Sequence, residues 1–301
     1  MSRKIWLPTA RWIGRAVLVL AAWQGPGAVA AAQDKEIRLI VRGDDIGSCH
    51  AANEACIRCC REGIVRSLEI MVPTPWYKEA VKMLKENPGI DVGVHLTLTS
   101  EWQLYKWGPV THAPSLVDPH GHFFPSTSQR RDFPPDTGFL QAKPKLDEVE
   151  KELRAQIELA LADLPNVSHL TSHMGTPTAS PELRAVVAKL AKKYRLPLEA
   201  PGVKPAGYLG GPNATPEQKE AAMVRIVESL TPGTWLLVDH PGLDTPEMRA
   251  IGHVGYENVA ADREGVTRAF TSDKVKEAVR RRSVRLMSYA EFHKAPATRG
   301  L

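Results

Sequence analysis

The sequence predicts one α/β domain built as a distorted (β/α)7-8 TIM-like barrel, and three observations lead to this fold. Short apolar runs of strand length alternate with helical patterns along most of the chain, which is typical of parallel βα units. Several of these runs end on aspartate or histidine, and barrel enzymes assemble their sites at the carboxyl ends of strands. An open doubly wound sheet is the alternative, although no Gly-x-Gly-x-x-Gly turn follows the first run.

The elements alternate without a linker that would divide the chain. The expected strands lie at 36–42, 67–72, 90–97, 168–173, 196–199, 234–239 and 284–288. The expected helices lie at 48–61, 75–86, 146–164, 181–194, 215–230 and 272–282. Two of them have clear start signals, Ser180-Pro181-Glu182 and Thr215-Pro216-Glu217.

One long segment, from about 100 to 145, has neither a helical nor a strand period. A loop of this length inside a compact domain is usually functional. We expect its aromatic residues to form a lid or a platform for sugar rings: Trp102, Tyr105, Trp107, Phe123 and Phe124. Its three histidines, His112, His120 and His122, are expected at the surface, because ligands need a rigid scaffold.

The first 32 residues have the pattern of a secretory signal peptide. Four basic residues precede an apolar core at 16–23, and small residues follow at 28–32. The apolar core is too short to anchor the chain across a bilayer, so we expect cleavage and export to the periplasm or medium. Residues 33–301 then form the barrel domain.

Charge argues against a nucleic-acid partner. The full chain has a formal net charge of +5, and removal of the four basic residues in 1–32 leaves +1. A nearly neutral mature protein lacks the basic footprint of nucleic-acid binding. The four cysteines, Cys49, Cys56, Cys59 and Cys60, lie within one expected helix, where we interpret them as buried small apolar residues rather than a zinc site.

The first strand ends on two adjacent carboxylates, Asp44 and Asp45. Neighbouring side chains on a strand point in different directions, so the pair predicts two different roles, such as metal ligand and proton acceptor. The alternative is that one aspartate caps the following helix. Later strands end on His95, His173 and His240. One carboxylate and two imidazoles on separate strands are typical of a catalytic zinc site, whereas magnesium prefers oxygen ligands.

Five blocks of sequence, in order from about residue 36 to the end, resemble the YdjC-like carbohydrate deacetylases. The blocks are Arg42-Gly43-Asp44-Asp45-Ile46-Gly47, Gly63-Ile64-Val65-Arg66-Ser67 with Met71-Val72, Asp91-Val92-Gly93-Val94-His95-Leu96-Thr97-Leu98-Thr99, His169-Leu170-Thr171-Ser172-His173, and His240-Pro241-Gly242. The resemblance implies a distorted barrel, a divalent metal and removal of N-acetyl groups from an amino sugar or oligosaccharide. The ligand types favour zinc, with magnesium possible.

The resemblance also implies a role for each matched residue. Asp45, His95 and His173 take the positions of the metal ligands, Asp44 that of the base and His240 that of the acid. In such a reaction a water acidified by the metal attacks the acetyl carbonyl, and the acid protonates the leaving nitrogen. The chain departs from the family at Thr171, where an aspartate is usual.

Two other functions stay open from the sequence. A glycoside hydrolase on the same barrel needs two carboxylates on either side of a bond, which adjacent Asp44 and Asp45 cannot provide, although Glu199 is a distant candidate. An exported carbohydrate-binding protein with a degenerate site is the second alternative, because of Thr171. In every case the expected partner is a sugar, with no nucleic acid and no stable membrane anchor.

Overall fold

The computed structural model describes residues 36–198 and 200–295. The predicted signal peptide and Glu199 lie outside these residues, so cleavage and export stay predictions. Among the described helices, none is both long enough and apolar enough to cross a membrane.

A parallel sheet forms the centre of the molecule. The strands are β1 (Ile37–Ile46), β2 (Ser67–Ile70), β3 (Asp91–Leu96), β4 (Val167–Ser172), β5 (Lys204–Pro205), β6 (Gly233–Asp239) and β7 (Arg285–Met287). The order along the sheet is β4-β3-β2-β1-β6-β5. β6 pairs along one edge of β1, and β2 and β7 share the other, each in parallel register. The described strands β4 and β5 end the sheet without pairing to each other, so the predicted barrel is confirmed in a curled, open form.

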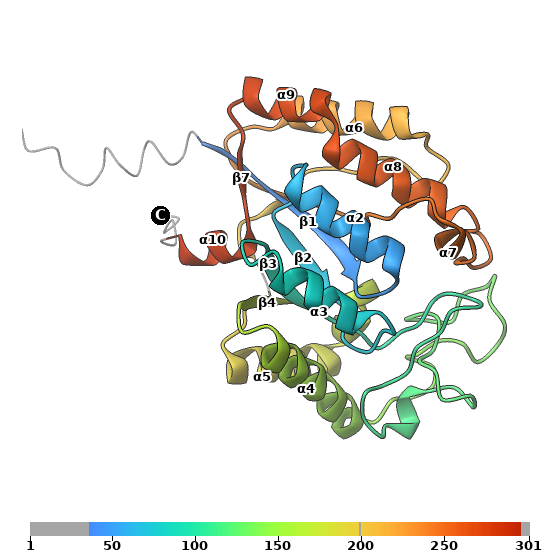
Figure 1. The fold of residues 1–301 in the computed structure, drawn as a ribbon. Helices are drawn as coiled ribbons and strands as arrows, with labels where there is room; N and C mark the ends of the chain where they lie inside the picture. Colours follow the sequence, from blue (N-terminus) through green and yellow to red (C-terminus); the bar gives the residue numbers. More distant parts are fainter. Residues whose placement is uncertain (1–35, 199, 296–301) are drawn as a thin grey trace, which may run out of the picture.

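Helices cover the sheet on both sides. They are α2 (His50–Arg61), α3 (Tyr77–Lys85), α4 (Leu146–Asp163), α5 (Pro181–Tyr194), α6 (Pro216–Ser229), α7 (Pro246–Arg249), α8 (Val259–Thr271), α9 (Asp273–Arg281) and α10 (Tyr289–Lys294). Figure 1 shows α4 and α5 on one side of the molecule and α6, α8 and α9 on the opposite side. Leu39 and Val41 of β1 are completely buried in the main core cluster, whereas Ile40, which points to the other face, packs with Met287 and Tyr289.

The predicted start signals form caps. Ser180 accepts a hydrogen bond from the backbone N–H of Leu183, and Thr215 forms a capping box with Gln218. The first turn of α2 is satisfied differently, because Glu247 accepts hydrogen bonds from the backbone N–H groups of residues 50 and 51. The alternative in which Asp44 or Asp45 caps this helix is therefore wrong.

The expected strand at 196–199 is also wrong, since residues 196–198 have no strand structure. The carbonyl of Pro197 accepts one hydrogen bond from Leu170 of β4, but proline has no N–H with which to continue a ladder. The next paired segment is β5, six residues further along. Helix α8 was not expected, because Gly265 and two threonines weaken its helical pattern; packing against α6 and α2 stabilises it.

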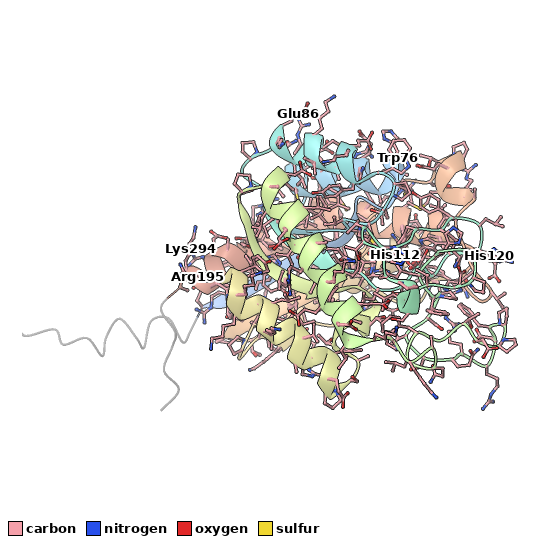
Figure 2. The ribbon with its side chains drawn as sticks, turned by 90° about the horizontal axis from the view of Figure 1, so that it is seen from below. Trp76, Glu86, His112, His120, Arg195 and Lys294 are labelled. Carbon is pink, nitrogen blue, oxygen red and sulfur yellow. The ribbon has the colours of Figure 1, made fainter. Side chains whose placement is uncertain are left out.

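Several apolar side chains of the long loop pack into the core, although most of its residues are exposed or half-buried. The loop lies beyond the carboxyl ends of β1 and β2 (Figure 1). Trp102, Trp107 and Phe123 are buried, so their faces are unavailable to a sugar and the predicted platform is wrong for them. Tyr105 is half-buried, and Phe124, although largely buried, lines a cavity, so the prediction stays open for these two. The three loop histidines are exposed or half-buried, as expected, and Figure 2 labels two of them, His112 and His120.

The cysteines behave as small apolar side chains. Cys49, Cys56 and Cys59 are buried, Cys60 is half-buried, and all four are free thiols. Burial raises the pKa of each thiol, so none is a reactive thiolate near neutral pH.

Candidate metal centre

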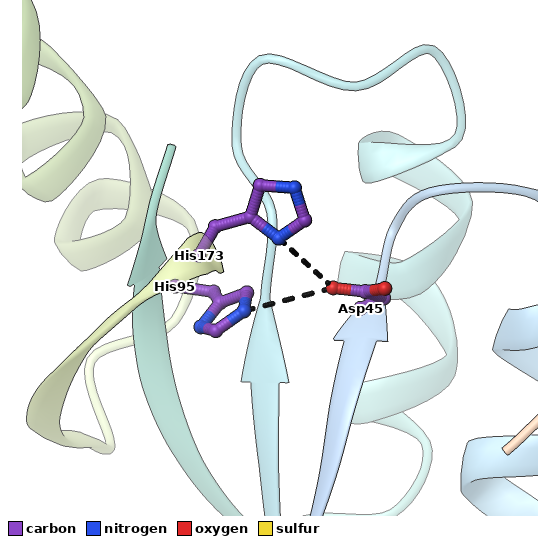
Figure 3. Close-up of side chains that lie close together, drawn as sticks. All are labelled: Asp45, His95 and His173. Atoms are coloured by element: carbon purple, nitrogen blue, oxygen red, sulfur yellow. Dashed lines mark ion pairs between the residues drawn. The ribbon is translucent and has the colours of Figure 1, made fainter. Parts of the chain in front are cut away.

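The side chains of Asp45, His95 and His173 meet in one buried place (Figure 3). Asp45 lies in β1 and His95 in β3, whereas His173 begins the short 3-10 helix that directly follows β4. One ligand atom from each lies within 4.8 Å of the other two. Asp45 Oδ1 is 3.6 Å from His95 Nε2 and 3.3 Å from His173 Nδ1. Three atoms at these distances can share one ion.

A local distortion of β1 turns both aspartates toward the same place. Asp45 has a φ of 70°, in the left-handed region, and the pairing of β1 with β2 shifts register between Gly43 and Ile46. The simple alternation expected for a strand therefore ends here. The carboxylate of Asp44 also reaches the site, with Oδ2 3.7 Å from His95 Nε2. The two carboxylates differ in their partners rather than in the direction they face.

Two arginines hold the aspartates. Arg42 donates from Nε and Nη2 to the two oxygens of Asp44, at 2.7 and 2.8 Å. Arg263, in α8, donates to Asp45 Oδ2 at 2.9 Å. The other oxygen of Asp45, Oδ1, is buried and accepts no hydrogen bond. A buried carboxylate oxygen that accepts no hydrogen bond and faces two imidazole nitrogens fits a divalent metal ligand.

The electrostatics favour an ionised Asp45. Burial alone would raise the pKa of its carboxyl, but the nearby charges of His240, Arg263 and His173 lower it well below the usual value. An ionised carboxylate is the form that binds metal.

The two histidines titrate in opposite directions. Burial lowers the pKa of His95 to about 4, so its ring is neutral near pH 7. Burial also acts on His173, but the carboxylates of Glu101 and Asp45 outweigh it and raise its pKa to about 10. Glu101 lies 3.0 Å from His173 Nε2, which leaves Nδ1 toward Asp45. A carboxylate behind a ligand histidine is the usual way to orient such a ring.

His240 lies at the rim of the site. Its Nε2 is 4.0 Å from Asp45 Oδ2, and its Nδ1 is 3.7 Å from Asp239. The side chain is 41% exposed, whereas those of Asp45, His95 and His173 are almost completely buried. This position between the buried ion site and solvent suits a group that meets substrate.

Thr171 contacts the site through His95 rather than through His173. Its Oγ1 is 2.8 Å from His95 Nδ1 and donates to Glu69 Oε2 at 2.6 Å. The other oxygen of Glu69 is 2.8 Å from Nε2 of His169. The sequence lacks a carboxylate at position 171. Glu69 of β2 supplies one instead, but it reaches the proposed ligand His95 only through the hydroxyl of Thr171.

Gly93 leaves the space for the pair formed by Glu69 and His169. A Cβ at this position would lie 2.2 Å from Glu69 Oε2 and 2.5 Å from His169 Nε2. We expect Gly93→Ala to separate the pair and to destabilise the fold by about 3–5 kcal/mol, the scale of breaking a buried ion pair. Urea unfolding would measure this loss, with Gly89→Ala as the control, because a Cβ at Gly89 meets no atom within 4 Å. Equal free energies of unfolding for the two variants would contradict the role of Gly93 in leaving space for this pair.

Several of these partners were not found from the sequence. Arg42 carried a signal, since it stands two residues before Asp44 on the same strand and so shares its face. Glu69, Glu101 and Arg263 carried none, because they reach the site only through the pairing of strands and the packing of α8 and the loop.

Comparison with known proteins identifies the family of this chain. The pattern that defines the YdjC-like protein family matches residues 38–281. The chain belongs to the YdjC-like family. Among its relatives, a carbohydrate deacetylase of Thermus thermophilus is 34% identical over 236 residues, covering 71% of this chain and 80% of the relative. A carbohydrate deacetylase of Brevibacillus brevis is 28% identical, over 85% of this chain and all of the relative.

The fold of this YdjC-like protein also has a solved counterpart. A crystal structure from Enterococcus faecalis, described as that of a candidate cellobiose-phosphate cleavage protein, superposes with a TM-score of 0.68. The two sequences are 25% identical, and the match covers 85% of this chain and 98% of the other. The open α/β barrel is therefore the architecture of both proteins.

Proposed function

We propose that this protein is a metal-dependent hydrolase that removes N-acetyl groups from an amino sugar or its oligosaccharides. The observation that carries the proposal is the meeting of Asp45, His95 and His173 around Asp45 Oδ1, which accepts no hydrogen bond, with a second carboxylate beside them. Membership of the YdjC-like family and relatives named carbohydrate deacetylase support the class of reaction.

The three ligands favour zinc. Two imidazoles and one carboxylate are a common catalytic zinc set, whereas magnesium binds mainly to oxygen. An ion held by these residues would polarise the acetyl carbonyl and make water more acidic. The rest of the reaction depends on groups that the chain itself supplies.

Asp44 is the proposed base. Arg42 holds both of its oxygens and so fixes the orientation of the carboxylate. Asp44 takes a proton from the attacking water as the water oxygen bonds to the acetyl carbon. His240 then gives a proton to the leaving nitrogen as the carbon–nitrogen bond breaks, which yields acetate and a free amine. Acid and base groups of this kind each contribute about 10²–10⁴-fold to a rate.

A cavity beside the metal centre could hold the sugar. Its volume is about 280 Å³, and its lining includes Glu101, Lys106, Phe124, Phe133 and His253. Glu101 faces this cavity and also contacts His173, so the cavity lies next to the proposed ligands. Aromatic side chains and a few polar groups are what a sugar ring needs for binding.

We expect the purified protein with added zinc to release acetate from tri-N-acetylchitotriose without creating new reducing ends. A coupled acetate assay and a reducing-sugar assay on the same sample measure the two products. New reducing ends without acetate would support the glycoside hydrolase alternative instead. Sugar binding by calorimetry, with neither product formed, would support the binding protein and contradict the proposal.

A further inference from the structure

His95 is connected to a buried carboxylate by a chain of two hydrogen bonds. Its Nδ1 lies 2.8 Å from Thr171 Oγ1, and this hydroxyl lies 2.6 Å from Glu69 Oε2. The three side chains come from neighbouring strands β3, β4 and β2, and all are buried. Because the three side chains are buried, solvent does not compete for these hydrogen bonds. Which atom donates and which accepts therefore depends on the protonation of the three side chains.

The direction of each bond is determined by Glu69. The attraction of His169 and Arg42 outweighs burial and lowers the pKa of the Glu69 carboxyl, so it is ionised and can only accept. Thr171 has one hydroxyl hydrogen, and Glu69 accepts it. The oxygen of Thr171 is then left as an acceptor, and the hydrogen in the bond to the ring must come from His95 Nδ1.

Because Nδ1 carries the hydrogen, the lone pair of the neutral His95 ring lies on Nε2. That nitrogen lies 3.6 Å from Asp45 Oδ1 and 3.7 Å from Asp44 Oδ2, beyond hydrogen-bond distance from either carboxylate, whereas the contact of Nδ1 with Thr171 is a hydrogen bond of 2.8 Å. The opposite tautomer would place an N–H at the ion site and two facing lone pairs at the Thr171 contact. A neutral imidazole binds metal only through the nitrogen that has no hydrogen.

We propose that Thr171 and Glu69 are positioning residues that select the Nδ1–H tautomer of His95 and hold its Nε2 toward the metal. This inference rests on the proposed metal site but concerns residues that touch neither metal nor substrate. Glu69 is itself held by His169 on its other oxygen, in the space that Gly93 leaves open. The chain of hydrogen bonds from His95 through Thr171 to Glu69, here called the relay, therefore ends at a carboxylate that is held in place in the core.

The first experiment needs no metal and no variant. In the metal-free wild type, labelled with ¹⁵N histidine near pH 7, long-range ¹H–¹⁵N spectra should show His95 as the Nδ1–H tautomer. The Nε2–H tautomer would overturn the inference. This measurement does not involve the ion, so it tests the roles of Thr171 and Glu69 even in a protein that binds no zinc. A failure to bind zinc would overturn the proposed function instead.

The second experiment removes the hydroxyl. Thr171→Val keeps the shape of the side chain, and we expect it to raise the zinc Kd by about 10–100-fold, the usual scale for a group behind a ligand histidine. Thr171→Ser keeps the hydroxyl and should bind zinc within about 3-fold of wild type, well below that range. Competition with a chromophoric chelator measures all three constants.

Thr99→Val is the matched control, because Thr99 is also buried and, among the described residues, its hydroxyl is hydrogen-bonded only to Thr176, at 3.4 Å. It should leave both the zinc Kd and the His95 spectrum unchanged. Wild-type zinc affinity in Thr171→Val, together with an unchanged His95 tautomer, would overturn the inference. The spectrum separates loss of the relay from general damage, since a merely structural role for Thr171 would leave the tautomer as it is.

Discussion

Asp44→Asn is expected to lower kcat for acetate release by about 10²–10⁴-fold while the protein keeps its metal. An amide has nearly the shape of the carboxylate but cannot take a proton from water. Asp44 is beside the ion site, and its two oxygens are held by Arg42 rather than by the proposed ligands. The variant should therefore separate proton transfer from metal binding.

Steady-state kinetics and elemental analysis of the same preparation measure the two effects of this change. Asp163→Asn is a suitable control, because this aspartate ends α4 and its carboxylate contacts Lys78 and Tyr77, neither of which belongs to the proposed site. Near wild-type turnover by Asp44→Asn with a full metal content would show that another group is the base.

His95→Ala is expected to abolish both tight metal binding and acetate release. His95 contributes the ring at the centre of the group, within 3.7 Å of both aspartates. A ligand stabilises the folded state by about 2.7 kcal/mol at 100 times its Kd. For a domain of this size we expect zinc to raise the Tm of the wild type by about 5–10 °C.

The His95→Ala variant should show no such rise in Tm, and a thermal scan with and without zinc measures it. His112→Ala is the control for loss of a histidine, since His112 is exposed on the loop. An undiminished zinc-dependent rise in His95→Ala would place the ion somewhere else.

The sequence was informative wherever a strand ended. In a parallel sheet all carboxyl ends lie at one edge, so Asp45, His95 and His173 could be expected to meet without knowledge of the loops. The helices with strong caps, α5 and α6, were also predictable, because a cap depends on residues next to each other in the chain.

The partners of these residues were less predictable, because they depend on contacts between distant segments. Glu69 and Glu101 reach the two histidines from β2 and from the loop, and Arg263 reaches Asp45 from α8. The prediction that the side chains of Asp44 and Asp45 point in different directions was also wrong. The left-handed backbone at Asp45 breaks the alternation of β1, and no residue type announced it.

In the proposed reaction, one divalent ion shared by Asp45, His95 and His173 is required for the removal of acetyl groups. Zinc titration of the metal-free protein, with acetate release from tri-N-acetylchitotriose measured at each step, tests it most directly. We expect activity to rise from background in proportion to zinc and to level off at one ion per chain. Full acetate release before any metal is added, or none after one ion is bound, would contradict the account.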